Sequence, residues 1–416
     1  MKDIKTKDKK TIFFYQVAYL FFMMYFCYDS NVVIFRHPNT TVYISLVLTI
    51  VLLTISIFFH RFRFNKKVAI LAIICSFFTL ASGLIFQTNF NNLLAFLILY
   101  FTIFIVSCCY TKKQFITSFI ISVFIACICA WITQLLLYPL YTRGVISTTK
   151  YYIERSYWPR LDFLIGFSVP ANGTIQRMYS FFREPGVLQI FILLALSFVL
   201  FYKNDIKRKK LLIIIFVSSL IATFSVSGVL CGILLLFSWF LKSDSKMSDK
   251  GKKIVLLLLI IGMIYFGTKL ITSNELLSTN VSNMLSKMFG GTENESFNTR
   301  TFSIMYILKA SLESPIIGLG WDYGLRYIME LSQQIDITGT TLVIAAVYGW
   351  PLCILCNWLI FKLFKDIHSD NNWLSFLLNF IAIILSINTQ NILQNVFIWF
   401  LISLSLFQEE RDSCEQ

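Results

Sequence analysis

Two polar clusters in an otherwise apolar chain contain the residue types that could do chemistry. The first runs from Arg177 to Gly186, with the sequence Arg-Met-Tyr-Ser-Phe-Phe-Arg-Glu-Pro-Gly, and stands directly before a long apolar run. Proline suits the first position of a helix, and the residue before it is steered away from helical geometry. The sequence therefore predicts that Glu184 is the N-cap of a helix that begins at Pro185, with its carboxylate at the positive end of the helix dipole.

The charged residues of this cluster suit recognition of an anion beside a proton acceptor. Arg177 and Arg183 are close enough in sequence to share one pocket with Glu184, and Gly186 leaves the backbone open to a ligand. A guanidinium binds phosphate or carboxylate through two parallel hydrogen bonds, and a positioned carboxylate can accept a proton from a hydroxyl group. The simpler interpretation is a capped helix whose arginines reach the membrane surface, and both interpretations stay open.

The second cluster begins at Arg300 and ends at Trp321. An apolar, helix-like stretch follows Arg300, and the sequence Pro-Ile-Ile-Gly-Leu-Gly-Trp occupies residues 315–321. The proline, together with Gly318 and Gly320, predicts a tight turn whose backbone amides can approach an anion or a sugar. Trp321 would then be placed to stack on a pyranose ring. The alternative is a plain loop turn with a tryptophan at the membrane interface.

The elements that must position these clusters are predicted to be membrane helices. The chain has 416 residues, of which 57% are hydrophobic and 14% charged, and its mean hydropathy is +0.71. A soluble domain carries about a quarter charged residues, so this composition indicates an all-α polytopic membrane protein. The formal net charge of +14 is then a matter of membrane orientation, and no nucleic-acid partner is expected.

Hydropathy predicts how often the chain crosses the membrane. A helix needs about 20 apolar residues to cross the bilayer. Stretches of this kind predict spans near 12–28, 40–59, 68–87, 92–109, 115–138, 186–202, 254–272, 339–361, 371–387 and 390–408. The run 211–241 is too long for one span, and Ser225-Val226-Ser227-Gly228 in its middle is typical of a turn, so we expect this run to cross and return.

Basic residues give the direction of the spans. Lysine-rich segments at 207–210 and 250–253 flank the run 211–241, and cytoplasmic connectors attract lysine and arginine. Both ends of the run are therefore predicted to be cytoplasmic, and so is the connector 242–253. The result is about twelve transmembrane helices in a single integral membrane domain, 1–416, with both termini in the cytoplasm.

Two large connectors, 139–185 and 273–338, then form outer-face loops that hold both polar clusters. Arginine prevails over lysine on this face, whereas the cytoplasmic connectors carry mainly lysine. The outer arginines are Arg36, Arg143, Arg155, Arg160, Arg177, Arg183, Arg300 and Arg326. Orientation needs only charge, and a guanidinium adds bidentate recognition of phosphate or carboxylate. The asymmetry therefore predicts an anionic substrate on the outer face.

Together the clusters resemble the bacterial O-antigen and capsular polysaccharide repeat-unit polymerases (Wzy type), of the O-antigen polymerase/ligase superfamily. The pattern Arg-x-x-(Gly/Ser)-x-x-x-Glu-Pro-Gly from Arg177 looks like their first signature, with Ser180 where glycine is commoner. Arg300 followed by Pro315-x-x-Gly318-x-Gly320 is similar to their second-loop signature. The break at 225–228 and the sequence Tyr348-Gly349-Trp350 also look like features of this family.

The resemblance implies a glycosyltransferase that polymerises undecaprenyl-diphosphate-linked oligosaccharide repeat units at the outer face of the bacterial cytoplasmic (inner) membrane. It implies a lipid-bilayer setting, with a chain-length regulator and a flippase as candidate partners. No Asp-x-Asp motif or histidine cluster stands on the outer face, so we expect an inverting reaction without metal or cofactor. The expected catalytic residues are Glu184, Arg177 and Arg300, and the expected substrate-binding residues are Arg183, Pro185, Gly186, Gly318, Gly320 and Trp321.

Two alternatives stay open. The related O-antigen ligases have an important histidine in the second large loop, whereas the histidines of this chain are His37, His60 and His368, which favours a polymerase. A flippase or other transporter of lipid-linked oligosaccharides would carry charged residues within its spans, along a central path. The apolar runs of this chain are almost free of charge, so a transporter is the second alternative.

Overall fold

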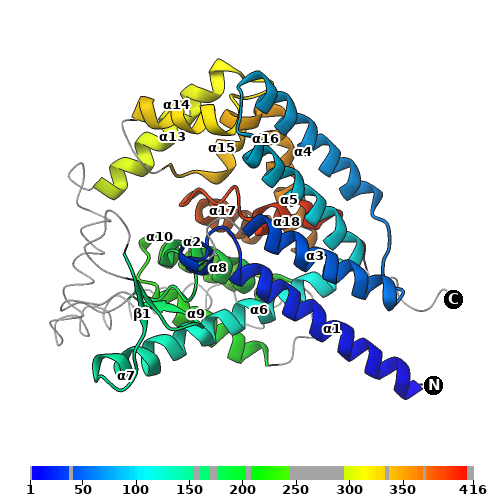
Figure 1. Ribbon diagram of the computed structural model, residues 1–416, viewed down its shortest axis with the longest axis vertical. Helices are drawn as coiled ribbons and strands as arrows, with labels where there is room; N and C mark the ends of the chain where they lie inside the picture. Colours follow the sequence, from blue (N-terminus) through cyan, green and yellow to red (C-terminus); the bar gives the residue numbers. More distant parts are fainter. Residues whose placement is uncertain are drawn as a thin grey trace. The chain divides into compact units, whose positions relative to one another are not determined.

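The computed structural model describes residues 2–36, 41–152, 160–168, 177–202, 208–242, 295–332, 337–368 and 372–409. Within these ranges the chain is mostly helical, with one small antiparallel sheet (Figure 1). The predicted span 254–272 and nearly all of the predicted connector 242–253 lie outside the described residues.

The chain divides into two compact units, which are described separately. Unit 1 consists of Met1–Ile125, Thr299–Asp366 and Ile387–Gln416, and unit 2 consists of Ala126–Asn298 and Ile367–Ser386.

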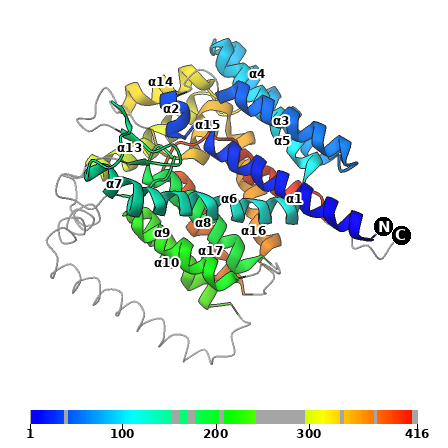
Figure 2. The ribbon, with the colours of Figure 1, turned by 60° about the horizontal axis from the view of Figure 1, so that its bottom comes forward.

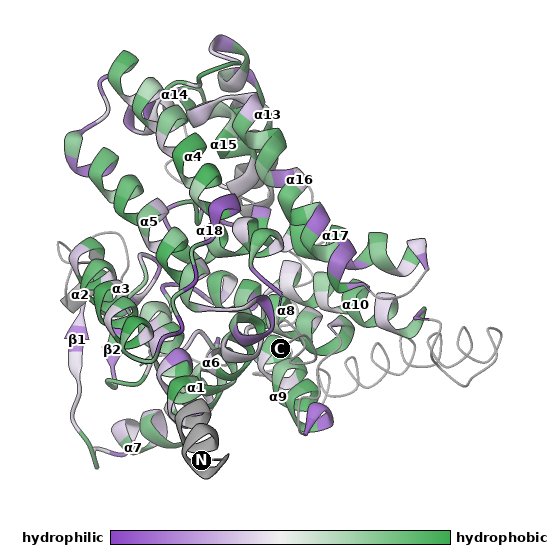
Figure 3. Cartoon of the chain, turned by 90° about the vertical axis from the view of Figure 1, so that its right-hand side faces the viewer, coloured by the Kyte–Doolittle hydropathy of each residue, from purple (hydrophilic) through white to green (hydrophobic). Residues whose placement is uncertain are grey.

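Three helices of the described chain are long and apolar enough to cross a membrane. They are α4 (Lys66–Ile85), α5 (Phe90–Cys109) and the run Lys112–Thr142, which joins α6 (Lys112–Ile132), a π-helical turn (Thr133–Leu137) and α7 (Tyr138–Thr142). They match the spans predicted near 68–87, 92–109 and 115–138. Figure 3 shows hydrophobic residues over most of α4 and α5.

Other predicted spans also form helices, and most of these are shorter. They are α1 (Lys2–Tyr25), α3 (Thr41–Phe58), α8 (Pro185–Phe201), α9 (Lys209–Ala222), α10 (Val226–Phe240) and α17 (Trp373–Asn388). The run 211–241 breaks as predicted, because α9 ends at Ala222 and α10 begins at Val226, but Val226, Ser227 and Gly228 of the predicted turn belong to α10. A short helix, α2 (Asn31–Arg36), follows α1. The total of twelve spans stays a prediction.

Two predicted spans are wrong in extent. The segment 339–361 is not one helix, because it breaks at Gly349 into α15 (Thr340–Tyr348) and α16 (Trp350–Ile367). Gly349 has a φ of 90°, and a Cβ there would lie 2.1 Å from the carbonyl oxygen of Ile316, so this close approach of two backbones requires glycine.

The last predicted span, 390–408, is helical only in its second half. Helix α18 (Val396–Ser403) begins after Asn395, whose side chain accepts a hydrogen bond from Phe397 N as an N-cap, and a 3-10 turn (Leu404–Leu406) follows. The side-chain nitrogen of Asn395 donates to Asp29 at 2.9 Å. Asn395 thus caps α18 and bonds to buried Asp29 at a point where the hydropathy pattern predicts the middle of a continuous helix.

The second large loop contains two helices in its described part. The helix-like stretch expected after Arg300 is confirmed as α13 (Glu295–Glu313), and α14 (Trp321–Ser332) follows the glycine turn. The first large loop contains the small sheet, formed by β1 (Thr149–Tyr151), β2 (Arg160–Asp162) and β3 (Phe167–Ser168). Both strand pairs are antiparallel, with Lys150 opposite Leu161 and Leu161 opposite Ser168. The expectation of an all-α chain does not include this sheet.

In unit 1, α5 packs against α3 and α4, as Figure 1 shows. Buried aromatic rings meet edge to face in its interior. The Tyr100 ring lies 4.9 Å from that of Trp399, and the Phe96 ring lies 5.6 Å from that of Tyr348. Such pairs contribute about 1 kcal/mol each beyond the burial of their area.

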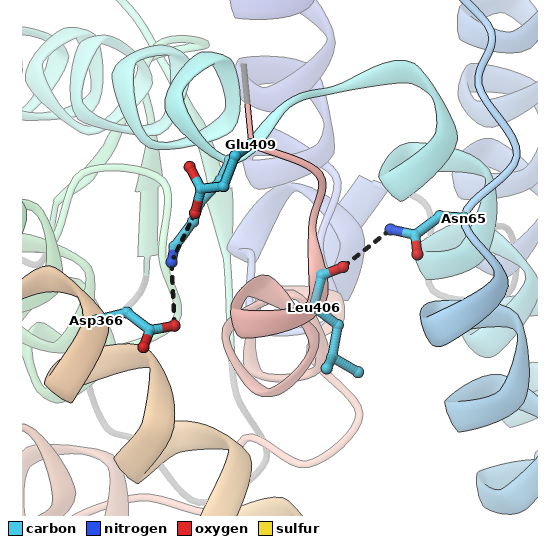
Figure 4. A network of polar contacts seen from close by, with 5 residues as sticks. Asn65, Asp366, Leu406 and Glu409 are labelled. Carbon is cyan, nitrogen blue, oxygen red and sulfur yellow. Dashed lines mark hydrogen bonds and ion pairs between the residues drawn. The ribbon is translucent and has the colours of Figure 1, made fainter. Parts of the chain in front are cut away.

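One end of unit 1 joins the connectors 60–67, 110–114 and 362–370, which the predicted spans place in the cytoplasm, with the end of the last predicted span and the residue after it (Figure 4). The ammonium group of buried Lys112 lies 3.3 Å from the carboxylates of both Asp366 and Glu409. The side chain of Asn65 donates to the carbonyl oxygen of Leu406 at 3.1 Å. These contacts join segments that are predicted to share one side of the membrane, and which side that is stays a prediction.

A second set of contacts in unit 1 joins segments predicted for the outer face. The carboxylate of Asp322, at the start of α14, accepts hydrogen bonds of 2.6 Å from both Asn89 N and the side chain of Asn92. The side chain of Asn388 accepts from Thr341 N at 3.0 Å. Segments with the same predicted side thus contact one another at each end of the helices.

In unit 2, α8 packs against α9 and α10 (Figure 2). Every residue of α8 is buried, so this helix is enclosed on all sides. The hydroxyl of Ser375, on α17, donates to the carbonyl oxygen of Ser238 on α10 at 2.7 Å. The packing of α8 on α9 and α10 therefore gives the first polar cluster, at the start of α8, a helical support.

Candidate functional site around Arg177 and Glu184

The first cluster consists of exposed ends and a buried middle. Residues 178–182 are all buried, while Arg177 and Glu184 are exposed. The backbone nitrogen of Met178 donates to the carbonyl oxygen of Ala222 at 2.9 Å, and the Phe182 ring stacks on that of Phe191 at 4.7 Å. The apolar middle therefore anchors the two charged ends on α8 and α9.

A tight turn at Ser180 shapes this buried segment. Ser180 has a φ of 54°, in the left-handed region that favours glycine. Its hydroxyl donates to the carbonyl oxygen of Ala126 at 3.0 Å, and its own carbonyl accepts from Phe167 N at 2.8 Å. The position where the family resemblance has glycine more often is thus one where the backbone favours glycine.

Arg177 contacts the break between α9 and α10. Its Nε donates to the carbonyl oxygen of Thr223 at 3.1 Å, and its own carbonyl oxygen accepts from the side chain of Gln134 at 3.1 Å. Gln134 belongs to the π-helical turn, a rare element that is found often at functional sites. The structure therefore brings together the first cluster and the α9–α10 break, which sequence analysis identified separately.

Glu184 occupies the predicted helix start. It is the N-cap of α8, with a φ of −147° and a ψ of 154°, and Pro185 is the first helical residue, as predicted. The carboxylate makes no capping hydrogen bond. It also forms no ion pair within the described residues, neither with Arg177 nor with half-buried Arg183. The exposed carboxylate thus lies at the positive end of the α8 dipole.

Pro185 and Gly186 are buried in the structure. They begin α8, whose backbone nitrogens at Val187 and Leu188 donate to the carbonyl oxygen of Glu184 at 3.1 and 3.3 Å. The structure gives both residues a role in the helix start, and their contact with substrate stays a prediction.

Arg160 adds a further guanidinium to this part of unit 2. It lies on β2, and its guanidinium carbon is 5.1 Å from the centre of the Tyr179 ring, in cation–π geometry. Burial raises the pKa of Tyr179 to about 12, although Arg160 acts in the opposite direction. The phenol is therefore protonated at neutral pH, and its ring supports Arg160.

A buried polar group that sequence analysis missed lies one turn into α8. The side chain of Gln189, fully buried, donates to the Ser227 hydroxyl at 3.0 Å, and that hydroxyl is 3.3 Å from the hydroxyl of Ser225. A Cβ on Gly228 would lie 2.1 Å from Gln189 Oε1, so glycine makes this approach possible. A lone glutamine in the otherwise apolar run after Pro185 is the signal that points to it.

The second cluster forms the predicted tight turn in unit 1. Gly318 and Gly320 have φ values of 79° and 70°. The amides of this turn bond to the chain itself, because Leu319 N donates to Ala346 at 2.8 Å and Gly320 N donates to Val347 at 3.0 Å. In this structure the glycines thus serve close packing of the turn on α15, and binding of a ligand by these amides stays a prediction.

Trp321 and Arg300 lie in the same unit as this turn. Trp321 is 8% exposed, and its ring meets the edge of Phe96 at 5.0 Å, so in this structure the indole packs within unit 1. Stacking of Trp321 on a sugar stays a prediction. Arg300 is in α13, and its side chain lies outside the described residues.

The arrangement in unit 2 can bind an anion beside a carboxylate that has no partner in the described chain. Arg177 has its guanidinium directed by a backbone carbonyl, Arg183 lies two residues before the first residue of α8, and Glu184 is exposed at the start of that helix. Bidentate binding of phosphate and proton transfer from a hydroxyl group both need groups of these types. Comparison of the chain with protein-family models and with curated proteins finds no match.

Proposed function

We propose that this protein is a membrane glycosyltransferase that polymerises undecaprenyl-diphosphate-linked oligosaccharide repeat units into O-antigen or capsular polysaccharide. The proposed place of reaction is the outer face of the bacterial cytoplasmic membrane. The proposal rests on the resemblance of the two polar clusters to the repeat-unit polymerases and on the geometry around Arg177.

The observation that carries the proposal is the hydrogen bond between Arg177 Nε and the carbonyl oxygen of Thr223. It joins the pattern that runs from Arg177 to Gly186 to the break between α9 and α10, and both are features in which the chain resembles the repeat-unit polymerases. A guanidinium whose plane is set by a backbone carbonyl is suited to a planar, bidentate phosphate contact. Helices of sufficient length and apolarity for a membrane supply the setting for a lipid-linked donor.

In the proposed reaction, the hydroxyl of an acceptor sugar attacks the anomeric carbon of the donor chain. The new glycosidic bond forms as the bond between that carbon and the diphosphate breaks, and the lipid diphosphate leaves with the bonding electron pair. Arg177, supported by Arg183, neutralises the charge that develops on the diphosphate, and a like role for Arg300 stays an expectation from the sequence. Such stabilisation contributes several kcal/mol in a partly dry site.

Glu184 is the proposed proton acceptor for the attacking hydroxyl. Its exposure, and the lack of a partner for its carboxylate within the described residues, support this role over that of holding Arg177 or Arg183 in place. Attack from the face opposite to the diphosphate inverts the anomeric centre, and no step of this route needs a metal or cofactor.

Reconstitution tests the proposal. The purified full chain is placed in liposomes with a purified undecaprenyl-diphosphate-linked repeat unit, and products are separated by length on a gel. We expect a ladder of lengthened chains and release of undecaprenyl diphosphate, without added transporter. With a lipid A acceptor added to the same liposomes, a single product joined to that acceptor would indicate the ligase alternative. Movement of the substrate across the bilayer without chain extension would indicate the transporter alternative, and either result would overturn the proposal.

A further inference from the structure

Unit 1 contains a cavity of about 580 Å³, within the usual size range of ligand pockets. Its walls come from Cys27 and Tyr28 in the segment after α1, from the start of α3, from the first turns of α5, and from the residues around the start of α18. None of the residues proposed for the transfer reaction lines it. The exposed rings of Tyr28 and Tyr43 border the cavity, so it opens to the surface of the unit.

Uncharged polar side chains line one part of this cavity. They include Tyr43, Asn91, Asn92 and Gln394. Side chains of these types offer both hydrogen-bond donors and acceptors, which suits hydroxyl groups. The predicted orientation places this polar part at the outer membrane face, because it lies at the starts of α3 and α5, where both spans begin on the outside.

Apolar side chains line the part of the cavity farther along α5. Leu94, Ala95, Ile98 and Leu99 follow one another at helical spacing on α5, and Val396 adds the start of α18. The lining extends along α5 from Asn91 to Thr102, about 16 Å at the rise of an α-helix. An occupant of the whole cavity therefore has a polar end and an apolar chain.

The described lining of the cavity favours an uncharged head group over an anionic one. Among the described lining residues there is no lysine, arginine or histidine. A negative charge lies beside the polar part of the lining, because the side chain of Asn92 donates to the carboxylate of Asp322 at 2.6 Å. A phosphate that leaves water needs cationic or amide-rich partners, and the Asp322 carboxylate acts against it.

We propose that this cavity binds a lipid whose head group is uncharged and rich in hydroxyl groups, such as a glycolipid, in the outer leaflet. The amides of Asn91 and Gln394 bind the head-group hydroxyls, and the apolar residues of α5 contact the first part of the lipid chain. This site differs in chemistry from the arginine site for a diphosphate, and its existence does not depend on the transfer reaction.

Photolabelling tests the proposal. The full chain in lipid nanodiscs is irradiated with dodecyl glucoside that carries a diazirine in its alkyl chain, and labelled residues are identified by mass spectrometry. A dodecyl phosphate with the same diazirine is the matched anionic probe. We expect the glucoside to label residues 94–102 at least tenfold more than the phosphate does, and unlabelled dodecyl glucoside to compete.

Two variants and one control make the test specific. Ala95→Trp fills the cavity and should lower the labelling of residues 94–102 at least tenfold. Val47→Trp adds the same side chain at an exposed position of α3 and should leave labelling unchanged. The double variant Asn91→Leu with Gln394→Leu keeps the cavity and should remove the preference for glucoside over phosphate. If the Ala95→Trp protein does not fold, this double variant tests the proposal by itself.

Equal labelling of the Ala95→Trp and Val47→Trp proteins would overturn the proposal. Labelling of α5 by the phosphate probe as strong as that by the glucoside would overturn it too. Neither result depends on whether the protein extends polysaccharide, so failure of this proposal is distinguishable from failure of the proposed function.

Discussion

The Nε of Arg177 donates a hydrogen bond of 3.1 Å to the carbonyl oxygen of Thr223, a residue 46 positions further along the chain. A backbone hydrogen bond joins the same two segments, because Met178 N donates to the carbonyl oxygen of Ala222 at 2.9 Å. The end of α9 thus fixes both the chain and the side chain of the first arginine. A guanidinium held in this way loses less conformational freedom when it binds a phosphate than one on a free loop.

Replacing Arg177 by lysine tests whether the guanidinium fork matters. Arg177→Lys keeps the charge but loses the planar fork, and the backbone bond to Thr223 with it. A charge-assisted hydrogen bond contributes about 1.5–3 kcal/mol, so we expect chain extension to fall by on the order of tenfold to a hundredfold. The measurement is the initial rate of chain extension in liposomes, at equal amounts of inserted protein.

Arg143→Lys is the matched control for this variant. Arg143 is also an exposed arginine of the first large loop, and we assign it no part in the reaction. Its lysine variant should extend chains at the normal rate. Equal activity of the two variants would show that Arg177 acts only as a positive charge.

The turn at Ser180 predicts an unusual order of stabilities. Ser180→Ala and Ser180→Gly both remove the hydrogen bond to Ala126, but only glycine relieves the positive φ of 54°. We therefore expect the glycine variant to be about 1 kcal/mol more stable than the alanine variant. Thermal unfolding in detergent, with the two variants measured side by side, checks the order. A less stable glycine variant would contradict the backbone argument.

Hydropathy predicted the positions of most helices because an apolar stretch in this chain has few alternatives to a helix. It predicted the break between α9 and α10 from a serine- and glycine-containing turn. A glycine also interrupts the apolar segment 339–361 at position 349, but the length of that segment favoured one continuous span. The break there depends on the backbone of Ile316, a distant contact that local hydropathy does not contain.

The chemistry of the first cluster was partly predictable for a similar reason. The Glu184–Pro185 helix start follows from rules that act between neighbouring residues, and it was found from sequence. The contacts of Arg177 with Thr223 and of Gln189 with Ser227 join distant segments, so periodicity and spacing do not reveal them. The backbone amides of the Gly318 turn donate to carbonyl oxygens of α15, which is also a distant segment, so sequence spacing does not reveal these bonds either.

The turn at Gly318 should tolerate no side chain. A Cβ there would lie 2.3 Å from the carbonyl carbon of Val347, on a backbone with a φ of 79°. Gly318→Ala adds a backbone clash to the strain of a positive φ, so we expect a loss of about 3 kcal/mol or more in the free energy of unfolding. Thermal unfolding in detergent and the yield of inserted protein measure the effect.

Gly144→Ala separates the strain from the clash. Gly144 has a φ of 72°, and nothing lies within 4 Å of a Cβ built there. Its alanine variant should therefore lose only about 1 kcal/mol. Similar losses at the two positions would mean that the packing of the turn on α15 is looser than the structure has it.

Cysteine labelling tests the predicted orientation. Val145→Cys places a thiol at an exposed position of the first large loop, and Lys113→Cys places one at the start of α6. In a background with Cys414 replaced by serine, a membrane-impermeant maleimide should label position 145 in intact cells. Position 113 should react only after the membrane is permeabilised. The reverse pattern would remove the outer-face location of Arg177 and Glu184.

Replacing Glu184 by glutamine tests the proton acceptor. The N-cap position and the start of α8 do not depend on the carboxylate, because its side chain makes no capping hydrogen bond, so Glu184→Gln should insert and fold normally. Loss of a positioned general base lowers a rate by about a hundredfold or more. We therefore expect chain extension to fall by that factor, measured as the initial rate at saturating lipid-linked substrate.

A comparison with Glu184→Asp distinguishes the base from a purely electrostatic carboxylate. The shorter side chain keeps the charge but moves the oxygen atoms back towards the helix, so a base that must reach a hydroxyl should be impaired in this variant too. A carboxylate that serves only by its charge would leave the aspartate variant nearly fully active. Binding of the lipid-linked substrate should be unchanged in both variants, because the arginines remain. Near-normal length and yield of polymer from Glu184→Gln would exclude Glu184 as the base.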